Sequence, residues 1–332
     1  MTPKIIAIAG ATGNQGSSVV HAFLNTPNWK ARALTRNPSS PAAQALSSLG
    51  AELVKADLSD ISSLESAFAG AHAIFLNTDF WGPYVSGIGG SATHSSDDAF
   101  NTEVSHGKNA AIAASKVSTL ERFVYSALGP IQRASGGRYT QSYHWDAKAA
   151  IVDYIENEQT DLAKKTSFFY PGAYATNPLF MPKLDPQTGI YQFFLPLQGE
   201  TKIPIIDAAG STGVFVRELI QNEVPGTKLL AYDSFISLNE VVDVWARVTG
   251  KKAELVSVSA EYMNTEFGIP LEVLEAPRFI EESGYMGGIE GWIGPEGLRI
   301  PVQTDSFEAW LGKRDWRGIL DAGEVELEGV KE

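Results

Sequence analysis

The sequence predicts an α/β fold of the Rossmann type, a doubly wound parallel sheet with a smaller α/β lobe toward the C-terminus. Two observations support this fold. Short apolar runs, typical of strands buried on both faces of a sheet, alternate with segments of helical spacing. The helical segments are long enough to connect parallel strands by right-handed crossovers. With 332 residues, 44% of them hydrophobic, the chain can also bury a full core.

The first strand, turn and helix are the clearest of these elements. Residues 4–9 form a continuous apolar run, and Gly10 follows at once. From Gln15 onward the sequence has the apolar spacing of a helix, in the letters SSVVHAFLN. Pro27 ends this helix, because proline has no N–H group to continue it. The chain therefore opens as a strand, a glycine turn and a helix.

The same alternation continues to residue 170. The expected strands span residues 29–34, 51–55, 73–77, 122–126 and 166–170. The expected helices span residues 40–49, 59–68, 103–115 and 143–157. Two irregular stretches interrupt them, residues 80–98, which we expect to form a long loop, and residues 128–141.

After residue 170, proline and aromatic residues become more frequent and the alternation loosens. We therefore expect a Rossmann domain over residues 1–170. Residues 171–332 are expected to form a smaller lobe, packed over the mouth of the sheet, that binds a substrate or a partner. Some segments of this second part are expected to return to the large sheet.

The composition argues against several classes of protein. The formal net charge is −13 and no segment gathers Lys and Arg on one face, so nucleic-acid binding is not expected. No run approaches the roughly 20 apolar residues that cross a bilayer, and the first residues lack the pattern of a secretory signal. There is no cysteine, and the five histidines include no pair at ligand spacing, so no metal site is expected. We expect a cytoplasmic protein, or a nuclear one if its role is regulatory.

Three glycines at a spacing of three lie between the first strand and the first helix. In a Rossmann fold the first glycine permits a tight turn, the second lets the backbone approach a pyrophosphate, and the third lets the helix pack on the strand. The positive end of the helix then faces the phosphates. This position in the first βα unit favours dinucleotide binding over a purely structural turn. The predicted binding residues are Gly10, Ala11, Thr12, Gly13, Asn14, Gln15 and Gly16.

The end of the second strand indicates which dinucleotide is bound. NAD-specific sites carry an Asp or Glu there for the ribose 2′-hydroxyl, whereas this sequence reads Leu34-Thr35-Arg36-Asn37. Arg36 can instead hold a 2′-phosphate through a planar, charge-assisted fork. We therefore predict that residues 1–170 bind NADP(H). Further contacts are expected from Asp57 and Leu58 after the third strand, near the adenine, and from Asn77, Thr78 and Asp79 after the fourth, near the ribose and pyrophosphate.

The sequence resembles the NmrA-like family, an atypical branch of the short-chain dehydrogenase/reductase superfamily. The resemblance covers most of the chain and rests on GATGNQG, ALTRNP, GAELVKADLSD, NTDFW, RFVYSAL, YHWDAKAAIVDYI, YPGAYATNPL, DAAGSTGVFVRELI and SFISLNEVVDVWARVTGKK. It implies a Rossmann domain and a small C-terminal lobe, with the nicotinamide in the cleft between them. Some relatives carry a further basic residue shortly after the arginine, and residues 37–40 here have none. The resemblance implies that Thr78, Asp79 and Phe80 lie along the cofactor, that Lys148 reaches the nicotinamide ribose, and that Tyr174 and Asn177 close the pocket.

The residues that would transfer a proton depart from the short-chain dehydrogenase pattern. Conventional members use a tyrosine whose pKa is lowered by a lysine one helical turn later. Here His144 stands four residues before Lys148, and the neighbouring Tyr143 is rotated by about 100° around the helix. His144 can act as an acid or base near neutral pH, and Ser126 at the end of the fifth strand can bind a substrate oxygen. In the alternative, His144 only packs or hydrogen-bonds while Lys148 binds the cofactor.

Two functions remain open at this point. The first is an NADPH-dependent oxidoreductase that reduces a small lipophilic carbonyl, quinone or imine compound, and apolar residues near the expected cleft favour it. The second is a non-catalytic NADP(H) sensor that docks on a regulatory protein, as some relatives do. The pair of His144 and Lys148 fits both. The apolar and aromatic residues expected near the cleft are Phe80, Trp81, Tyr84, Trp145, Tyr170, Tyr174, Phe180, Met181, Phe279, Tyr285 and Met286.

Overall fold

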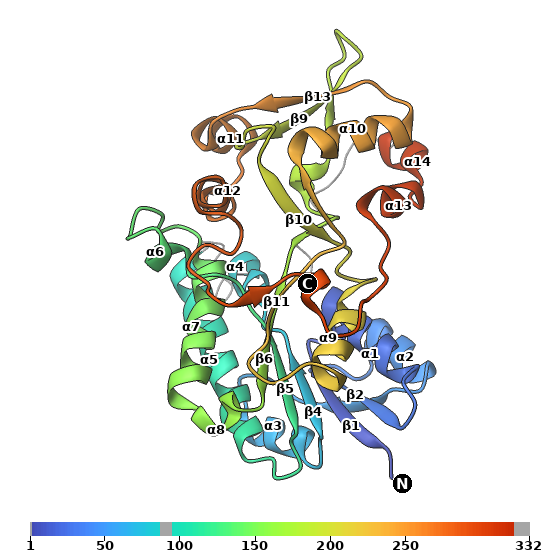
Figure 1. Cartoon of the computed structure of the whole chain (residues 1–332), viewed down its shortest axis with the longest axis vertical. Helices are drawn as coiled ribbons and strands as arrows, with labels where there is room; N and C mark the ends of the chain where they lie inside the picture. Colours follow the sequence, from blue (N-terminus) through green and yellow to red (C-terminus); the bar gives the residue numbers. More distant parts are fainter. Residues whose placement is uncertain (1, 87–94, 322–332) are drawn as a thin grey trace.

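A large parallel sheet forms the lower half of the molecule in Figure 1. The computed structural model describes residues 2–86 and 95–321. Within these residues the strand order is β3-β2-β1-β4-β5-β6-β11-β14, and every neighbouring pair is parallel. The order reverses between β1 and β4, and ligands bind at such a switch point. The strands are β1 (Lys4–Ala9), β2 (Trp29–Thr35), β3 (Glu52–Lys55), β4 (Ala73–Leu76), β5 (Arg122–Ser126), β6 (Thr166–Pro171), β11 (Lys228–Ala231) and β14 (Trp292–Ile293).

Helices cover both faces of this sheet. Ile6 and Ile8 of β1 belong to a core that α1, α2 and α9 close, whereas Ala7 and Ala9 belong to the core closed by α3, α5 and α7. Successive strand residues point to opposite faces, so the apolar run of β1 contributes to both cores. The predicted doubly wound α/β fold is confirmed. The helices are α1 (Asn14–Leu24), α2 (Pro41–Ser48), α3 (Ile61–Phe68), α5 (Ser96–Ser115), α7 (Tyr143–Glu158) and α9 (Thr212–Gln221), with the short α8 (Thr160–Ala163) after α7.

The observed elements differ most from the predicted ones between residues 80 and 141. The helix predicted from residue 103 begins at Ser96, because the Ser95 hydroxyl accepts a hydrogen bond from the Asp98 N–H group and caps the first turn. Part of the predicted long loop is also helical. In α4 (Trp81–Ser86), the Asp79 carboxylate accepts a hydrogen bond from the N–H group of Gly82 near the start of the helix. The second irregular stretch contains α6 (Ile131–Ala134), and residues 87–94 of the first lie outside the described residues.

Segments from the second half of the chain join the large sheet. β11 pairs with β6, β14 pairs with β11, and α9 packs on α1. The two helices approach closely, because a Cβ atom on Gly213 would lie 2.1 Å from the Ser18 carbonyl oxygen. The large sheet is therefore built from residues on both sides of position 171.

The second lobe lies beyond the carboxyl ends of the first strands, in the upper half of Figure 1. Its described residues contain the sheets β12-β10-β7 and β13-β9-β8. Its core is built around Trp245, which is buried and contacts Tyr191, Phe193 and Trp316. The elements are β7 (Ala173–Tyr174), β8 (Lys183–Leu184), β9 (Tyr191–Leu195), β10 (Lys202–Ile206), β12 (Ser234–Ser237), β13 (Ala253–Ser257), α10 (Leu238–Thr249), α11 (Ala260–Phe267), α12 (Leu271–Ser283), α13 (Phe307–Gly312) and α14 (Trp316–Asp321), with short 3-10 turns η2 (Pro178–Phe180) and η3 (Pro295–Gly297).

Candidate functional site

The glycine turn, residues 10–16, joins β1 to α1 and requires glycine at both of its ends. Gly10 has a φ of +76°, and a Cβ atom there would lie 3.2 Å from the Asn77 carbonyl oxygen. A Cβ atom on Gly16 would lie 2.0 Å from the Gly10 carbonyl oxygen. The N–H group of Gly13 donates a hydrogen bond to that same oxygen at 3.1 Å. The turn is therefore folded tightly on itself, beside the end of β4.

The first turn of α1 has backbone N–H groups available for an anion. Gly13 occupies the cap position, and no side chain accepts a hydrogen bond from the helix there. Asn14 is exposed and Thr12 is half-buried, whereas Ala11 and Gln15 are buried. The Gln15 side-chain amide donates to the Tyr174 hydroxyl at 2.6 Å, and burial raises the pKa of Tyr174. The second lobe thus contacts the glycine turn directly.

Arg36 follows β2 and is exposed, without a hydrogen bond or ion pair to any described residue. Nearby, the Asp57 carboxylate accepts hydrogen bonds from the Ser59 N–H group at 2.9 Å and the Ser59 hydroxyl at 2.8 Å. The bond from the N–H group lowers the pKa of Asp57 against the effect of burial, and the charge of Arg36 lowers it further. The Leu58 carbonyl accepts a hydrogen bond from the Asn109 side chain at 2.9 Å. Asp57 and Leu58 therefore hold the loop after β3 in place beside Arg36.

Lys148 on α7 points to the end of β4. Its ammonium group donates to the Thr78 carbonyl oxygen at 2.9 Å, to the Thr78 hydroxyl at 3.1 Å and to the Asn77 side-chain oxygen at 3.3 Å. It also pairs with Glu103 at 2.9 Å, and the two side chains are 12% and 0% exposed. Because Asn77 packs against Gly10, Lys148 is separated from the glycine turn by a single residue.

Glu103 on α5 was not predicted from the sequence. Its Oε1 accepts a hydrogen bond from the Thr78 hydroxyl at 2.6 Å, and its Oε2 is buried without a hydrogen-bond partner among the described residues. One signal could have identified it, since Ala99, Glu103 and Gly107 recur every four residues along one helix face. Small residues in this pattern indicate a closely packed face, and a carboxylate there needs a partner. Lys148 is that partner.

His144 lies one helical turn before Lys148 and faces the second lobe. Its Nδ1 lies 2.7 Å from Oε1 of Glu272 on α12, and its backbone N–H group donates to the same oxygen at 2.8 Å. The ring packs beside Trp81 and Phe80, with centroid distances of 4.9 Å and 5.9 Å. The sequence gives no signal for Glu272, which stands 128 residues further along the chain.

The remaining predicted residues make local contacts. Ser126 is fully buried, and its hydroxyl has no hydrogen-bond partner among the described residues. The Asn177 side chain accepts a hydrogen bond from the Leu179 N–H group at 2.9 Å and caps η2. Asp79 caps α4, as described above, and Phe80 is buried against Tyr84. The structure therefore brings Lys148, Thr78 and Tyr174 to the glycine turn, while Ser126 is enclosed.

Comparison with known proteins identifies the family. The family model described as NmrA-like family matches residues 2–311. The chain belongs to the NmrA-like family. It is 28% identical over 312 residues to the NmrA-like family domain-containing oxidoreductase hkm9 of Aspergillus hancockii, covering 89% of this chain and 86% of that protein.

Solved structures support the same fold for this NmrA-like chain. The crystal structure of NmrA, a negative transcriptional regulator, in complex with NADP has a TM-score of 0.72 and 20% identity, covering 98% of this chain and 99% of that one. The binary complex of leucoanthocyanidin reductase with NADPH from Vitis vinifera has a TM-score of 0.68 and 17% identity, covering 93% and 98%. At these identities the likeness shows the fold.

In this NmrA-like chain, most of the apolar and aromatic residues expected near the cleft pack into the cores. Trp81, Tyr174 and Met181 are half-buried. The others are buried, namely Phe80, Tyr84, Trp145, Tyr170, Phe180, Phe279, Tyr285 and Met286.

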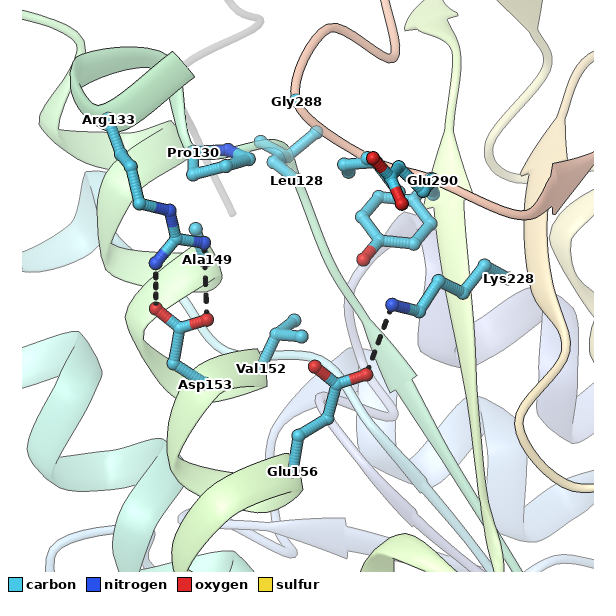
Figure 2. A pocket seen from close by; sticks show the side chains of 12 residues that line it. Leu128, Pro130, Arg133, Ala149, Val152, Asp153, Glu156, Lys228, Gly288 and Glu290 are labelled. Carbon is cyan, nitrogen blue, oxygen red and sulfur yellow. Dashed lines mark hydrogen bonds and ion pairs between the residues drawn. The ribbon is translucent and has the colours of Figure 1, made fainter. Parts of the chain in front are cut away.

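A pocket lies beside α7 (Figure 2). The ion pairs Arg133–Asp153 and Lys228–Glu156 lie along it, with shortest distances of 2.6 Å and 3.1 Å. None of the predicted cofactor-binding or catalytic residues lines this pocket.

Within residues 2–86 and 95–321, no helix has the length and apolar character needed to cross a membrane. In the same part of the chain, no three His, Asp or Glu side chains are grouped so as to hold a metal ion. His94 lies outside the described residues.

Proposed function

We propose that this chain binds NADP(H) and uses NADPH to reduce a small lipophilic carbonyl, quinone or imine compound. The observation that carries the proposal is the placement of Lys148, which binds Asn77 and Thr78 at the end of β4, where Gly10 also packs against Asn77. A lysine therefore lies beside the glycine turn at the switch point of the sheet, where dinucleotides bind. The name of the relative hkm9, an oxidoreductase, supports an enzymatic role.

The residues present fit a dinucleotide with a 2′-phosphate. The glycine turn has space for backbone but none for a Cβ at Gly16, and the uncapped N–H groups of α1 suit a pyrophosphate. Arg36 forms no hydrogen bond or ion pair with a described residue and follows β2, where a 2′-phosphate is held. Proteins of this fold have been solved with NADP and with NADPH, which agrees with this assignment.

Bound NADPH would supply a hydride, so the chain has to orient the acceptor and deliver a proton. We assign the proton to His144, because its Nε2 has no hydrogen bond to a described residue and its ring packs beside the apolar rings of Phe80 and Trp81. Ser126 is less suited, since it is fully buried. Lys148 positions the nicotinamide ribose and keeps a positive charge beside it.

A second candidate function is a non-catalytic NADP(H) sensor that docks on a regulatory protein. The hydrogen bond between Gln15 and Tyr174 favours it, because this bond connects the glycine turn to the second lobe. A nucleotide that binds one arrangement of this contact more tightly would shift the lobes toward that arrangement. NmrA, which shares the fold, is described as a negative transcriptional regulator.

Turnover separates the two functions. NADPH absorbance is followed with a panel of quinones, imines and ketones for the wild type, Lys148→Ala and His144→Ala, with His21→Ala as a control at an exposed histidine. A reductase oxidises NADPH with at least one acceptor, and His144→Ala lowers kcat by about 10²–10⁴-fold while His21→Ala does not. An unchanged kcat in His144→Ala would contradict the assigned proton donor. Tight NADPH binding and a change of shape without turnover of any acceptor would favour the sensor.

A further inference from the structure

Glu272 is a buried carboxylate of the second lobe that no step above uses. It lies in the first turn of α12 and is 3% exposed. Its Oε1 accepts a hydrogen bond from the His144 N–H group and faces His144 Nδ1, and its Oε2 accepts a hydrogen bond from the Ser96 hydroxyl at 2.8 Å. A carboxylate taken out of water needs such partners to remain charged. Glu272 therefore joins α12 to the first turns of both α5 and α7.

We infer that Glu272 is the positioning residue for His144, and that the second lobe thereby completes the proton-transfer site. This inference rests on the proposed reductase function. One oxygen, Oε1, binds both the backbone and the ring of His144, so the rotation of the ring is fixed. The neutral ring then carries its proton on Nδ1, and Nε2 is the nitrogen left for a substrate.

In the reduction of a carbonyl, the pair of His144 and Glu272 would supply the proton. Bound NADPH would supply a hydride to the carbonyl carbon and become NADP⁺, so the carbonyl oxygen would take up a proton from the chain. The Nε2–H bond of the His144 imidazolium breaks as the new O–H bond forms. The ring is left neutral with its proton on Nδ1, held by Glu272, and a solvent proton restores Nε2–H. The carboxylate stabilises the positive ring before transfer and holds the correct tautomer after it.

The other titratable groups near His144 do not duplicate Glu272. Burial raises the pKa of Asp146 to about 6, and this carboxyl accepts a hydrogen bond from the Gln132 N–H group at 3.1 Å. Burial also raises the pKa values of Tyr84 and Tyr143, so both phenols stay neutral. Within the described part of the chain, Glu272 is the carboxylate in hydrogen-bond contact with the His144 ring.

Glu272 also has a structural role, because accepting from the His144 N–H group caps the start of α7. The test must therefore keep the cap while changing the charge. Glu272→Gln does so, since the backbone N–H group holds an amide oxygen in the place of Oε1. Glu272→Leu removes both the cap and the charge. Glu275→Gln is a matched control on the same helix, because Glu275 accepts a hydrogen bond from the Gln141 N–H group and is not bonded to His144.

The first readout is the tautomer of His144 in the full-length chain, measured by ¹⁵N NMR and assigned by the signal lost in His144→Gln. We expect the Nδ1–H form in the wild type, Glu272→Gln and Glu275→Gln, and a shift in Glu272→Leu to the Nε2–H form, which an unconstrained histidine side chain prefers. The second readout is kcat, which should fall about 10–100-fold in Glu272→Gln with an unchanged KM for NADPH.

Each result has a defined meaning. The inference is overturned if Glu272→Leu keeps the Nδ1–H form, or if Glu272→Gln lowers kcat no more than Glu275→Gln does. If no acceptor is reduced by the wild type, the proposed function fails and the proton-transfer role of Glu272 fails with it. The tautomer result then shows separately whether Glu272 still orients the ring.

Discussion

The nucleotide end of the site, formed by the glycine turn and Arg36, is built differently from the histidine end, formed by His144 and Glu272. At the nucleotide end the backbone sets the geometry, with Gly10 at a φ of +76° and Gly16 packed on the Gly10 carbonyl. These residues belong to the first two βα units. At the histidine end, side chains from α7 and α12 set the geometry, and they stand 128 residues apart.

The two lobes therefore contribute different parts of the site. A change in the position of the second lobe would move Glu272 and so alter the histidine end, while the N–H groups of α1 and Arg36 would keep their places. In a reductase, closure of the second lobe would bring Glu272 to His144, so the proton donor would be in place only when the two lobes are in contact. In a sensor, the same contacts would report occupancy of the nucleotide end.

The largest predicted effect concerns Glu103, whose partner Lys148 lies between the two ends. We expect Glu103→Ala to lower the free energy of unfolding by about 3–5 kcal/mol, because it leaves the ammonium group of Lys148, only 12% exposed, without its carboxylate. Urea titration measures this loss. The double variant Glu103→Leu with Lys148→Met should recover most of it, since no buried charge remains. A loss below about 1 kcal/mol in Glu103→Ala would show that the Glu103–Lys148 pair is solvated. The pair would then not connect the nucleotide end of the site to the histidine end.

The nucleotide end could be predicted from the sequence because its determinants are local. The apolar run of β1, the glycines at positions 10 and 16 and the arginine after β2 follow one another along the chain, and each observed geometry agrees with the spacing. The doubly wound parallel sheet follows from the same alternation of strands and helices, since right-handed crossovers leave few topologies.

The histidine end could be predicted only in part. His144 was found through its spacing from Lys148, but Glu272 was not, because nothing local distinguishes it from other acidic residues of α12 such as Glu275. The start of α5 was missed for a different reason. Its cap, Ser95, stands in a stretch rich in Gly and Ser that is typical of loops, and the acidic residues after it stabilise the first turn of the helix. A contact between distant elements therefore determines the partner of His144, whereas a local cap determines the start of α5.

At the nucleotide end, the next prediction concerns the contact between Arg36 and the 2′-phosphate. Arg36→Ala should weaken NADPH binding by about 2 kcal/mol, roughly 30-fold, because a charge-assisted contact with the 2′-phosphate is lost. NADH has no such phosphate, and its affinity should hardly change. Lys30→Ala is a matched control, since Lys30 is an exposed cation at the other end of the same strand, β2. Isothermal titration of the three proteins, namely the wild type, Arg36→Ala and Lys30→Ala, with NADPH and with NADH checks this, and equal losses of affinity for the two nucleotides in Arg36→Ala would remove the 2′-phosphate role.

The smallest predicted effect concerns the pH dependence of the histidine end. Burial raises the pKa of Asp146 to about 6, above the value of about 3.9 in an unfolded chain. The folded state therefore binds more protons between pH 4 and pH 6, and its stability falls as the pH rises through this window. We expect a fall of about 1 kcal/mol from this group, because solvent screens a side chain that is partly exposed. Asp146→Asn keeps an acceptor for the Gln132 N–H group but does not titrate, so it should match the wild type at pH 4 and exceed it above pH 6.

We expect the opposite dependence of stability on pH for Asp57 at the nucleotide end. The hydrogen bond from the Ser59 N–H group lowers its pKa, so the folded state favours the charged carboxylate and gains stability from it above the unfolded pKa. Asp57→Asn should therefore be less stable than the wild type at neutral pH, and this difference should vanish as the pH falls through the lowered pKa. Urea titrations of both variants from pH 3 to pH 8 test the comparison. Differences of the same sign at both positions would show that net charge, rather than the local surroundings of each carboxyl, sets the response to pH.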